Sequence, residues 1–226
     1  MLLIAILVGL IPSFAWLIFY LHEDFRHPEP RSLVALTFFV GAVSAILVLP
    51  FQIVFNQWIQ KLAIGQFDLR TFLALAALEE IAKFFVVFLF IRKANAFTFE
   101  PIHPMIYMIV SALGFAALEN IASLYNTHSE ITRVFFESTI LRFVGATLLH
   151  TLASGIVGYY WGKAFSEHGH YTTFIVFGIA IATVVHALFN YLVIQTGPLT
   201  YPIAFLIFIS LFVLHDFELL KKFERR

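Results

Sequence analysis

The sequence contains no cysteine, few charged residues and no stripe of basic residues interleaved with aromatic ones. Without cysteine, the 226-residue chain has no disulfide, no thiolate metal site and no cysteine nucleophile. Only 12% of the residues are charged and the net charge is zero, whereas soluble domains carry about 25% charged residues. A nucleic-acid partner is therefore not expected.

Apolar residues, in contrast, are abundant. They make up 61% of the chain, and the mean hydropathy is +0.90. This composition indicates a polytopic protein embedded in the lipid bilayer. The first apolar stretch, Met1–Leu21, lacks a basic start and a cleavage site, so we expect a retained helix and not a removable signal peptide.

Seven stretches have the roughly 20 mostly apolar residues that a helix needs to cross a bilayer. We therefore expect an all-α fold: one integral-membrane domain, residues 1–226, built as a polytopic bundle of about seven transmembrane helices. The expected spans are residues 2–21, 33–55, 71–91, 104–126, 139–161, 173–195 and 200–217. The connection 56–70 mixes polar and apolar residues at helical spacing, and we expect it to lie along the membrane surface.

The distribution of lysine and arginine predicts the orientation of the bundle. On the side of the C-terminus lie nine of them, namely Arg26, Arg31, Arg92, Lys93, Lys163, Lys221, Lys222, Arg225 and Arg226. On the other side lie four, namely Lys61, Arg70, Arg133 and Arg142. We therefore expect a multi-pass protein of the cell (plasma) membrane, with its N-terminus outside and its C-terminus in the cytoplasm.

Ionisable and amide side chains interrupt four of the apolar stretches. An ionisable side chain at membrane depth costs on the order of several kcal/mol, and by default it marks a functional site. The side chains form four sets: Glu79, Glu80 and Lys83 in the third stretch, Glu119 and Asn120 in the fourth, His150 in the fifth, and His186 with Asn190 in the sixth.

These four sets are expected to meet in one layer of the membrane, between the third and sixth helices. A helix rises about 1.5 Å per residue, which places most of them roughly 10–16 Å below the outer surface. The side chains at that depth are Glu79, Glu80, Glu119, His150 and His186, whereas Asn190 lies about 7 Å deep. His186 and Asn190 share a helix face because they are four residues apart, while the adjacent Glu79 and Glu80 diverge by about 100°.

Carboxylates, imidazoles and an amide in an apolar wall suit the activation of a water molecule. A glutamate there serves as a general base or acid, and a histidine shares that role, binds a metal or donates to an oxyanion. Asn190, one turn from His186, is a candidate oxyanion donor. Glutamate and histidine together also suit Zn²⁺, so zinc-dependent and metal-free hydrolysis both remain open.

Other intramembrane hydrolases are excluded by residues that the sequence lacks. No HExxH segment is present, which excludes a zincin-type site. No aspartate occurs in any span before Asp216, which excludes a two-aspartate mechanism. Ser154 near His150 lacks a G-x-S-x-G turn and is a poor candidate nucleophile.

Four motifs in order resemble those of PrsW-type intramembrane proteases, a family within the superfamily of CAAX prenyl proteases and bacteriocin-processing enzymes. They are Glu79-Glu80-x-x-Lys83, Phe115-x-x-x-Glu119-Asn120, His150 within HTLASG, and His186-x-x-x-Asn190. The loop Pro28-x-Pro30-Arg31 is also similar to the family's acidic, proline-rich connection. The resemblance, over about residues 12–195, implies an intramembrane endopeptidase that cuts single-span membrane proteins, with anti-sigma factors as the best-known type of substrate.

Carried over by position, the resemblance assigns the catalytic centre to Glu79, Glu80, Glu119, His150, His186 and Asn190. Lys83 and Asn120 are expected to support it, and one of the two adjacent glutamates is expected to be the base. Family members are commonly labelled metalloproteases, and the ligands of a zinc ion would be Glu119, His150 and His186. Lys83 departs from the CAAX pattern, which favours arginine one residue later, so a prenylated substrate is not expected.

Two other classes of function also fit buried glutamates and histidines. A proton-coupled transporter or channel uses them as a proton relay, but repeat symmetry and broken helices, common in transporters, are not evident. A non-catalytic membrane scaffold of the same fold is the other alternative. Cleavage of a single-span substrate by the purified protein distinguishes a protease from both.

Overall fold

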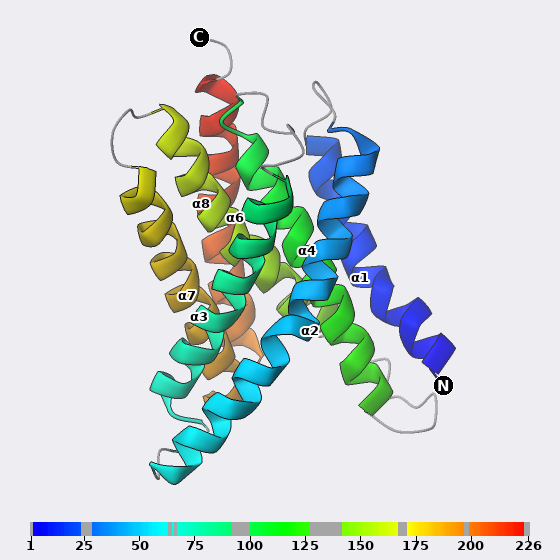
Figure 1. The fold of residues 1–226 in the computed structure, drawn as a ribbon, viewed down its shortest axis with the longest axis vertical. Coiled ribbons are helices and arrows are strands. Elements are labelled where there is room, and N and C mark those ends of the chain that lie inside the picture. Colours follow the sequence, from blue (N-terminus) through cyan, green and yellow to red (C-terminus); the bar gives the residue numbers. More distant parts are fainter. Residues whose placement is uncertain are drawn as a thin grey trace.

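The structure, a computed structural model shown in Figure 1, describes residues 2–23, 29–62, 65, 67–91, 100–126, 142–166, 171–196 and 199–223. Over these residues it contains helices and no strand, so the predicted all-α bundle is confirmed. The helices are α1 Leu2–Glu23, α2 Arg31–Lys61, α3 Leu69–Val86, α4 His103–Asn126, α6 Leu148–Ser166, α7 Tyr171–Gln195 and α8 Thr200–Phe223, with π-helical segments η1 Val87–Ile91 and η3 Arg142–Thr147.

Each of these α-helices overlaps one of the predicted stretches; residues 139–141, the start of the fifth, lie outside the described residues. Five of the described helices are long and apolar enough to cross a membrane: α1, α2, α4, α7 and α8. The other two, α3 and α6, carry Glu79, Glu80, Lys83 and His150, whose polarity lowers their hydropathy. In Figure 1, α1 begins in the lower half of the picture and α8 ends at the top.

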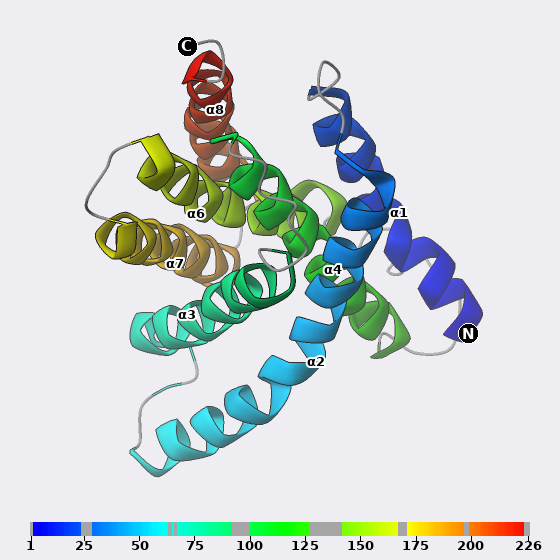
Figure 2. The same ribbon diagram turned by 45° about the horizontal axis from the view of Figure 1, so that its top comes forward.

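α4 is the central helix of the bundle (Figure 2). Of its most apolar 18-residue stretch 78% is buried, compared with 22% in α1 and in α8, which have most of their surface open to lipid. Glycines bring the neighbouring helices close to it. A Cβ at Gly41 of α2 would lie 2.1 Å from the Ser111 carbonyl oxygen, and one at Gly158 of α6 would lie 2.3 Å from Met105 Cα. These close approaches hold the elements around the site in tight contact.

α2 is longer than predicted. It has 31 residues and continues through residues 56–61, beyond the predicted end at residue 55, while the location of this segment along the membrane surface stays a prediction. Pro50 lies inside the helix and removes one backbone hydrogen bond from it, because proline has no N–H to donate to the preceding turn. Beyond that point α2 runs away from α4 (Figure 1), although it stays close enough to α3 for one contact described below.

A buried polar cluster joins the start of α2 to the start of α4. The Tyr107 hydroxyl donates to Glu29 Oε2, and His103 Nε2 lies 3.2 Å from Glu29 Oε1 and 2.9 Å from Glu100 Oε2. Glu29 is the residue between the two prolines of the proline-rich loop, of which Pro28 lies outside the described residues. This cluster fixes where α2 enters the bundle relative to α4.

Candidate active site

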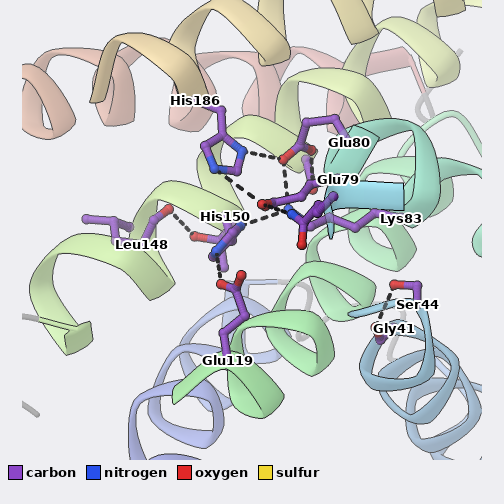
Figure 3. Close-up of polar contacts among 12 residues, drawn as sticks. Gly41, Ser44, Glu79, Glu80, Lys83, Glu119, Leu148, His150 and His186 are labelled. Carbon is purple, nitrogen blue, oxygen red and sulfur yellow. Dashed lines mark hydrogen bonds and ion pairs between the residues drawn. The ribbon is translucent and has the colours of Figure 1, made fainter. Parts of the chain in front are cut away.

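The four predicted sets of polar residues meet between α3, α4, α6 and α7. Figure 3 shows the side chains that converge, which are Glu79, Glu80, Lys83, Glu119, His150 and His186. All of them except Glu79 have a hydrogen bond to another member of the group, and Glu79 Oε2 lies 3.6 Å from His186 Nε2. The fold thus brings together side chains that are up to 107 positions apart in the sequence, from Glu79 to His186.

Glu80 is the most heavily bonded member of this group. Its Oε1 accepts from Lys83 Nζ at 2.8 Å and from His186 Nδ1 at 2.9 Å, and its Oε2 accepts from Ser154 Oγ at 2.9 Å. Glu80, Lys83 and Ser154 are all fully buried. A buried carboxylate needs this degree of compensation, because its desolvation is costly unless a counter-charge and hydrogen bonds replace water. Glu80 thus holds Lys83 and His186 in position.

Glu79, one residue earlier, has a different environment. Its Oε1 accepts a hydrogen bond from Gln52 Nε2 of α2 at 2.9 Å. Its Oε2 is buried and has no hydrogen-bond partner among the described residues, and it lies 3.6 Å from His186 Nε2. One oxygen of this carboxylate is therefore held, and the other remains available.

The ring of His186 lies between the two glutamates of α3, with Nδ1 2.9 Å from Glu80 Oε1 and Nε2 3.6 Å from Glu79 Oε2. Because Glu80 Oε1 can only accept when the carboxylate is ionised, His186 Nδ1 carries the proton of that hydrogen bond. In the neutral imidazole, Nε2 then has a free lone pair. With a neutral ring, Glu79 Oε2 and His186 Nε2 thus present lone pairs to each other at 3.6 Å, and a proton, a water molecule or a cation between them would stabilise the arrangement.

His150 lies between a cation and a carboxylate. Its Nδ1 is 2.8 Å from Lys83 Nζ, and its Nε2 is 2.8 Å from Glu119 Oε2. A lysine ammonium has only donors, so Nδ1 accepts and Nε2–H donates to Glu119. The Phe115 ring packs beside Lys83 and His150, with its centroid 4.3 Å from Lys83 Nζ and 5.4 Å from the centre of the His150 ring. The Glu119 side chain is 32% exposed, whereas His150 is buried.

The two predicted asparagines differ in their contacts. Asn120 is buried and donates from Nδ2 to Thr147 Oγ1 at 3.0 Å, which ties α4 to the π-helical segment just before His150. Asn190 is half-buried, and its side chain makes no hydrogen bond within the described part of the chain. Its predicted contribution to the site therefore stays a prediction.

The donor set of the site fits a metal ion in part. One ligand atom each from Glu79, His150 and His186 lies within 4.8 Å of the others. At a zinc–ligand distance of about 2.0–2.1 Å, two ligands of a tetrahedral ion lie roughly 3.3 Å apart, close to the 3.6 Å between Glu79 Oε2 and His186 Nε2. The Nδ1–H of His186 donates to Glu80, which is the usual support of a metal-binding histidine.

The third ligand fits less well, because both nitrogens of His150 already have partners. His150 joins the ligand set only if it releases Lys83 or Glu119. The predicted zinc ligands, Glu119, His150 and His186, differ from the observed group in one member, since Glu79 takes the place of Glu119. Glu119 instead accepts the hydrogen bond of His150.

Comparison with known proteins identifies the family of this chain. A family model described as "PrsW family intramembrane metalloprotease" matches residues 29–215, a range that includes every member of the site. The chain belongs to the PrsW family. Its relatives named "Protease PrsW" include one from Geobacillus kaustophilus, which is 34% identical over 69% of this chain and 64% of its own length.

Two further PrsW relatives match over more of their own length. The protein from Bacillus subtilis is 27% identical over 89% of this chain and 88% of the relative, and the one from Oceanobacillus iheyensis is 27% identical over 81% and 80%. The comparison with solved structures found no match. Membership in the PrsW family confirms the resemblance and makes the chain an enzyme, an intramembrane protease with several membrane helices, in preference to a transporter or a scaffold.

Two contacts of the site were not predicted from the sequence. Gln52 supports Glu79 from α2, and Ser154, considered only as a nucleophile, donates to Glu80 instead. The sequence contains one signal for the first: Gln52 is the only polar side chain between Ser44 and Asn56. An isolated amide at membrane depth needs a partner.

Proposed function

We propose that this PrsW family member hydrolyses a peptide bond of single-span membrane proteins, such as anti-sigma factors, with water activated by Glu79. The observation that carries the proposal is the buried Oε2 of Glu79, which has no hydrogen-bond partner among the described residues and lies 3.6 Å from His186 Nε2. A general base must have a lone pair within hydrogen-bond reach of the proton that it removes. Glu80 is less suited to this role, because its two oxygens already accept three hydrogen bonds, from Lys83, His186 and Ser154.

In the metal-free form of the reaction, Glu79 Oε2 takes a proton from water while the water oxygen bonds to the substrate carbonyl carbon. The tetrahedral intermediate then breaks its C–N bond, and the leaving amide nitrogen takes the proton back from Glu79. The products are a carboxylic acid and an amine, and the acid then passes its proton to the amine to give a carboxylate and an ammonium group. Asn190 is the proposed donor to the developing oxyanion, and Glu80 with Lys83 holds His186 and His150 in place.

In the metal-dependent form, Glu79 and His186 would hold zinc together with His150, and Glu119 is then the remaining carboxylate that can accept a proton. The ion would act as a Lewis acid and would lower the pKa of a water molecule bound to it to about 7. The partial exposure of Glu119 (32%) and its contact with His150 support this role. The family description as a metalloprotease supports zinc as the cofactor.

The proposed location is the cell (plasma) membrane, with the C-terminus in the cytoplasm and cleavage near the extracytoplasmic boundary. The excess of lysine and arginine on the side of the C-terminus supports this orientation. The depth of roughly 10–16 Å for the site, measured from the opposite side, supports cleavage near that boundary. Terminal reporter fusions test the orientation, which a C-terminus outside the cytoplasm contradicts.

Purified protein in detergent, incubated with single-span proteins, tests the function directly. Mass spectrometry of the products locates the cut, which is expected near the extracytoplasmic end of the substrate span. Parallel reactions with a chelator, together with metal analysis of the protein, distinguish the two forms of the mechanism. Activity that survives complete metal removal supports the metal-free form, and no cleavage of any single-span substrate contradicts the proposed substrate class.

A further inference from the structure

Gln52 is the only described residue of α2 that donates a hydrogen bond to a member of the site. Its Nε2 lies 2.9 Å from Glu79 Oε1 and has no other hydrogen-bond partner in the described ranges. The contact spans 27 positions of sequence and joins a helix without a predicted site residue to the candidate base.

The surroundings of Gln52 offer no alternative partner of the same kind. Residues of α2 and α3 next to Gln52 form an apolar groove, which is lined by Pro50, Phe51, Val54, Phe55, Trp58 and Leu78. Phe51 and Leu78 are the chain neighbours of Gln52 and Glu79. In such an apolar environment an amide gains from one good hydrogen bond and loses several kcal/mol, by order of magnitude, if it has none. The Gln52 side chain is therefore held on Glu79.

The hydrogen bond determines how Glu79 presents its second oxygen. Because Oε1 is held by Gln52, the carboxylate cannot rotate freely, and Oε2 stays directed at His186 Nε2. Gln52 is also a neutral donor. It orients the carboxylate without neutralising its charge, unlike Lys83, which pairs with Glu80.

We infer that Gln52 is a positioning residue of the protease, which holds Glu79 in the orientation needed for proton transfer. The inference rests on the proposed role of Glu79. A residue that supports a catalytic group in this way typically contributes a factor of about 10 to 100 to activity. It acts on the chemical step and not on substrate binding, since it contacts Glu79 through the oxygen that does not face the reaction centre.

The experiment compares Gln52→Met, which keeps the length of the side chain and removes the donor, with Gln52→His, which restores an N–H at similar reach. Gln57→Met is the matched control, because Gln57 lies on the same helix and is exposed. For each variant, kcat and KM are measured on one single-span substrate, and thermal unfolding is followed in detergent.

We expect Gln52→Met to lower kcat by about 10- to 100-fold with KM within about twofold, Gln52→His to recover part of the loss, and Gln57→Met to match the wild type. If Gln52 only filled space, Gln52→Met would be more active than Gln52→His, because methionine fills an apolar space better than histidine. Wild-type kcat in Gln52→Met overturns the inference. The inference is also overturned if Gln52→Met loses both kcat and thermal stability and Gln52→His restores neither. Full activity of Glu79→Gln, in contrast, contradicts the proposed function itself.

Discussion

Glu79 and Glu80 are adjacent on α3, yet the two faces of the helix give them opposite environments. Glu80 is fully buried and accepts three hydrogen bonds, two of them from Lys83 and His186. Glu79 accepts one, from a neutral amide, and keeps an oxygen unbonded. A turn of about 100° between neighbouring helical residues is enough to separate a carboxylate that organises the site from one that can react.

The first test of this difference removes the proposed base. Glu79→Gln keeps the shape of the side chain and its contact with Gln52 through an oxygen, but it cannot take a proton. We expect kcat to fall by about 10²- to 10⁴-fold, the usual contribution of general acid–base catalysis, with little change in thermal stability. Size-exclusion profiles and unfolding curves serve as controls for folding. Wild-type proteolysis by this variant would show that Glu79 is not the base.

The second test exposes the structural role of Glu80. Glu80→Gln leaves Lys83 buried without its counter-charge, because the two form an ion pair of 2.8 Å with both side chains fully buried. Breaking such a pair costs about 3–5 kcal/mol of unfolding free energy. Denaturant unfolding in detergent, compared with Glu79→Gln, measures the difference. Equal stability of the two variants would contradict the division of roles between these carboxylates.

The third test concerns the helix that faces both carboxylates. On the metal-free mechanism, Asn190→Ala slows cleavage by about 10²- to 10³-fold, the range for the loss of one oxyanion donor, while binding of an uncleavable substrate changes little. On the metal-dependent mechanism, His186→Ala abolishes metal retention and Asn190→Ala affects it only modestly. Cleavage rate, substrate affinity and bound metal are measured for both variants. Wild-type rates in both would make α7 purely structural.

The smallest expected effect lies at the exposed start of α3. Asp68 caps this helix by accepting from the Arg70 N–H at 2.8 Å, and its hydrogen bonds to the Arg70 side chain lower the pKa of Asp68 from 3.8 to about 2. A lowered pKa stabilises the fold above the unfolded value, and the contribution is lost as pH falls from about 4 through about 2. The thermal midpoint of Asp68→Ala should therefore lie slightly below that of the wild type at pH 6, and the gap should close toward pH 2. A gap that is independent of pH would contradict this.

Much of the fold could be predicted from the sequence, because the length of an apolar stretch and the spacing of side chains along a helix are local properties. The start of α4 at His103 and the end of α7 at Gln195 lie within one residue of the predicted ends. Depth along each helix follows from the rise per residue, and for that reason the glutamates of α3 and the histidines of α6 and α7 could be assigned to one layer. The α2 boundary was missed because the prediction ended the helix where the apolar residues end at Phe55, whereas polar residues such as those that follow do not by themselves stop a helix.

The contacts within that layer could not be predicted, since each of them joins residues that are distant in the sequence. Gln52 reaches Glu79 across 27 positions, and Ser154 and His186 reach Glu80 across 74 and 106. Which of the two glutamates accepts more hydrogen bonds depends on how α2, α6 and α7 are placed around α3, and close helix packing, such as that of Gly158 in α6 against Met105 in α4, contributes to that placement. The residue types and their depths are properties of single helices. The burial of Glu79 Oε2 without a hydrogen-bond partner, in contrast, results only from the packing of the helices against one another.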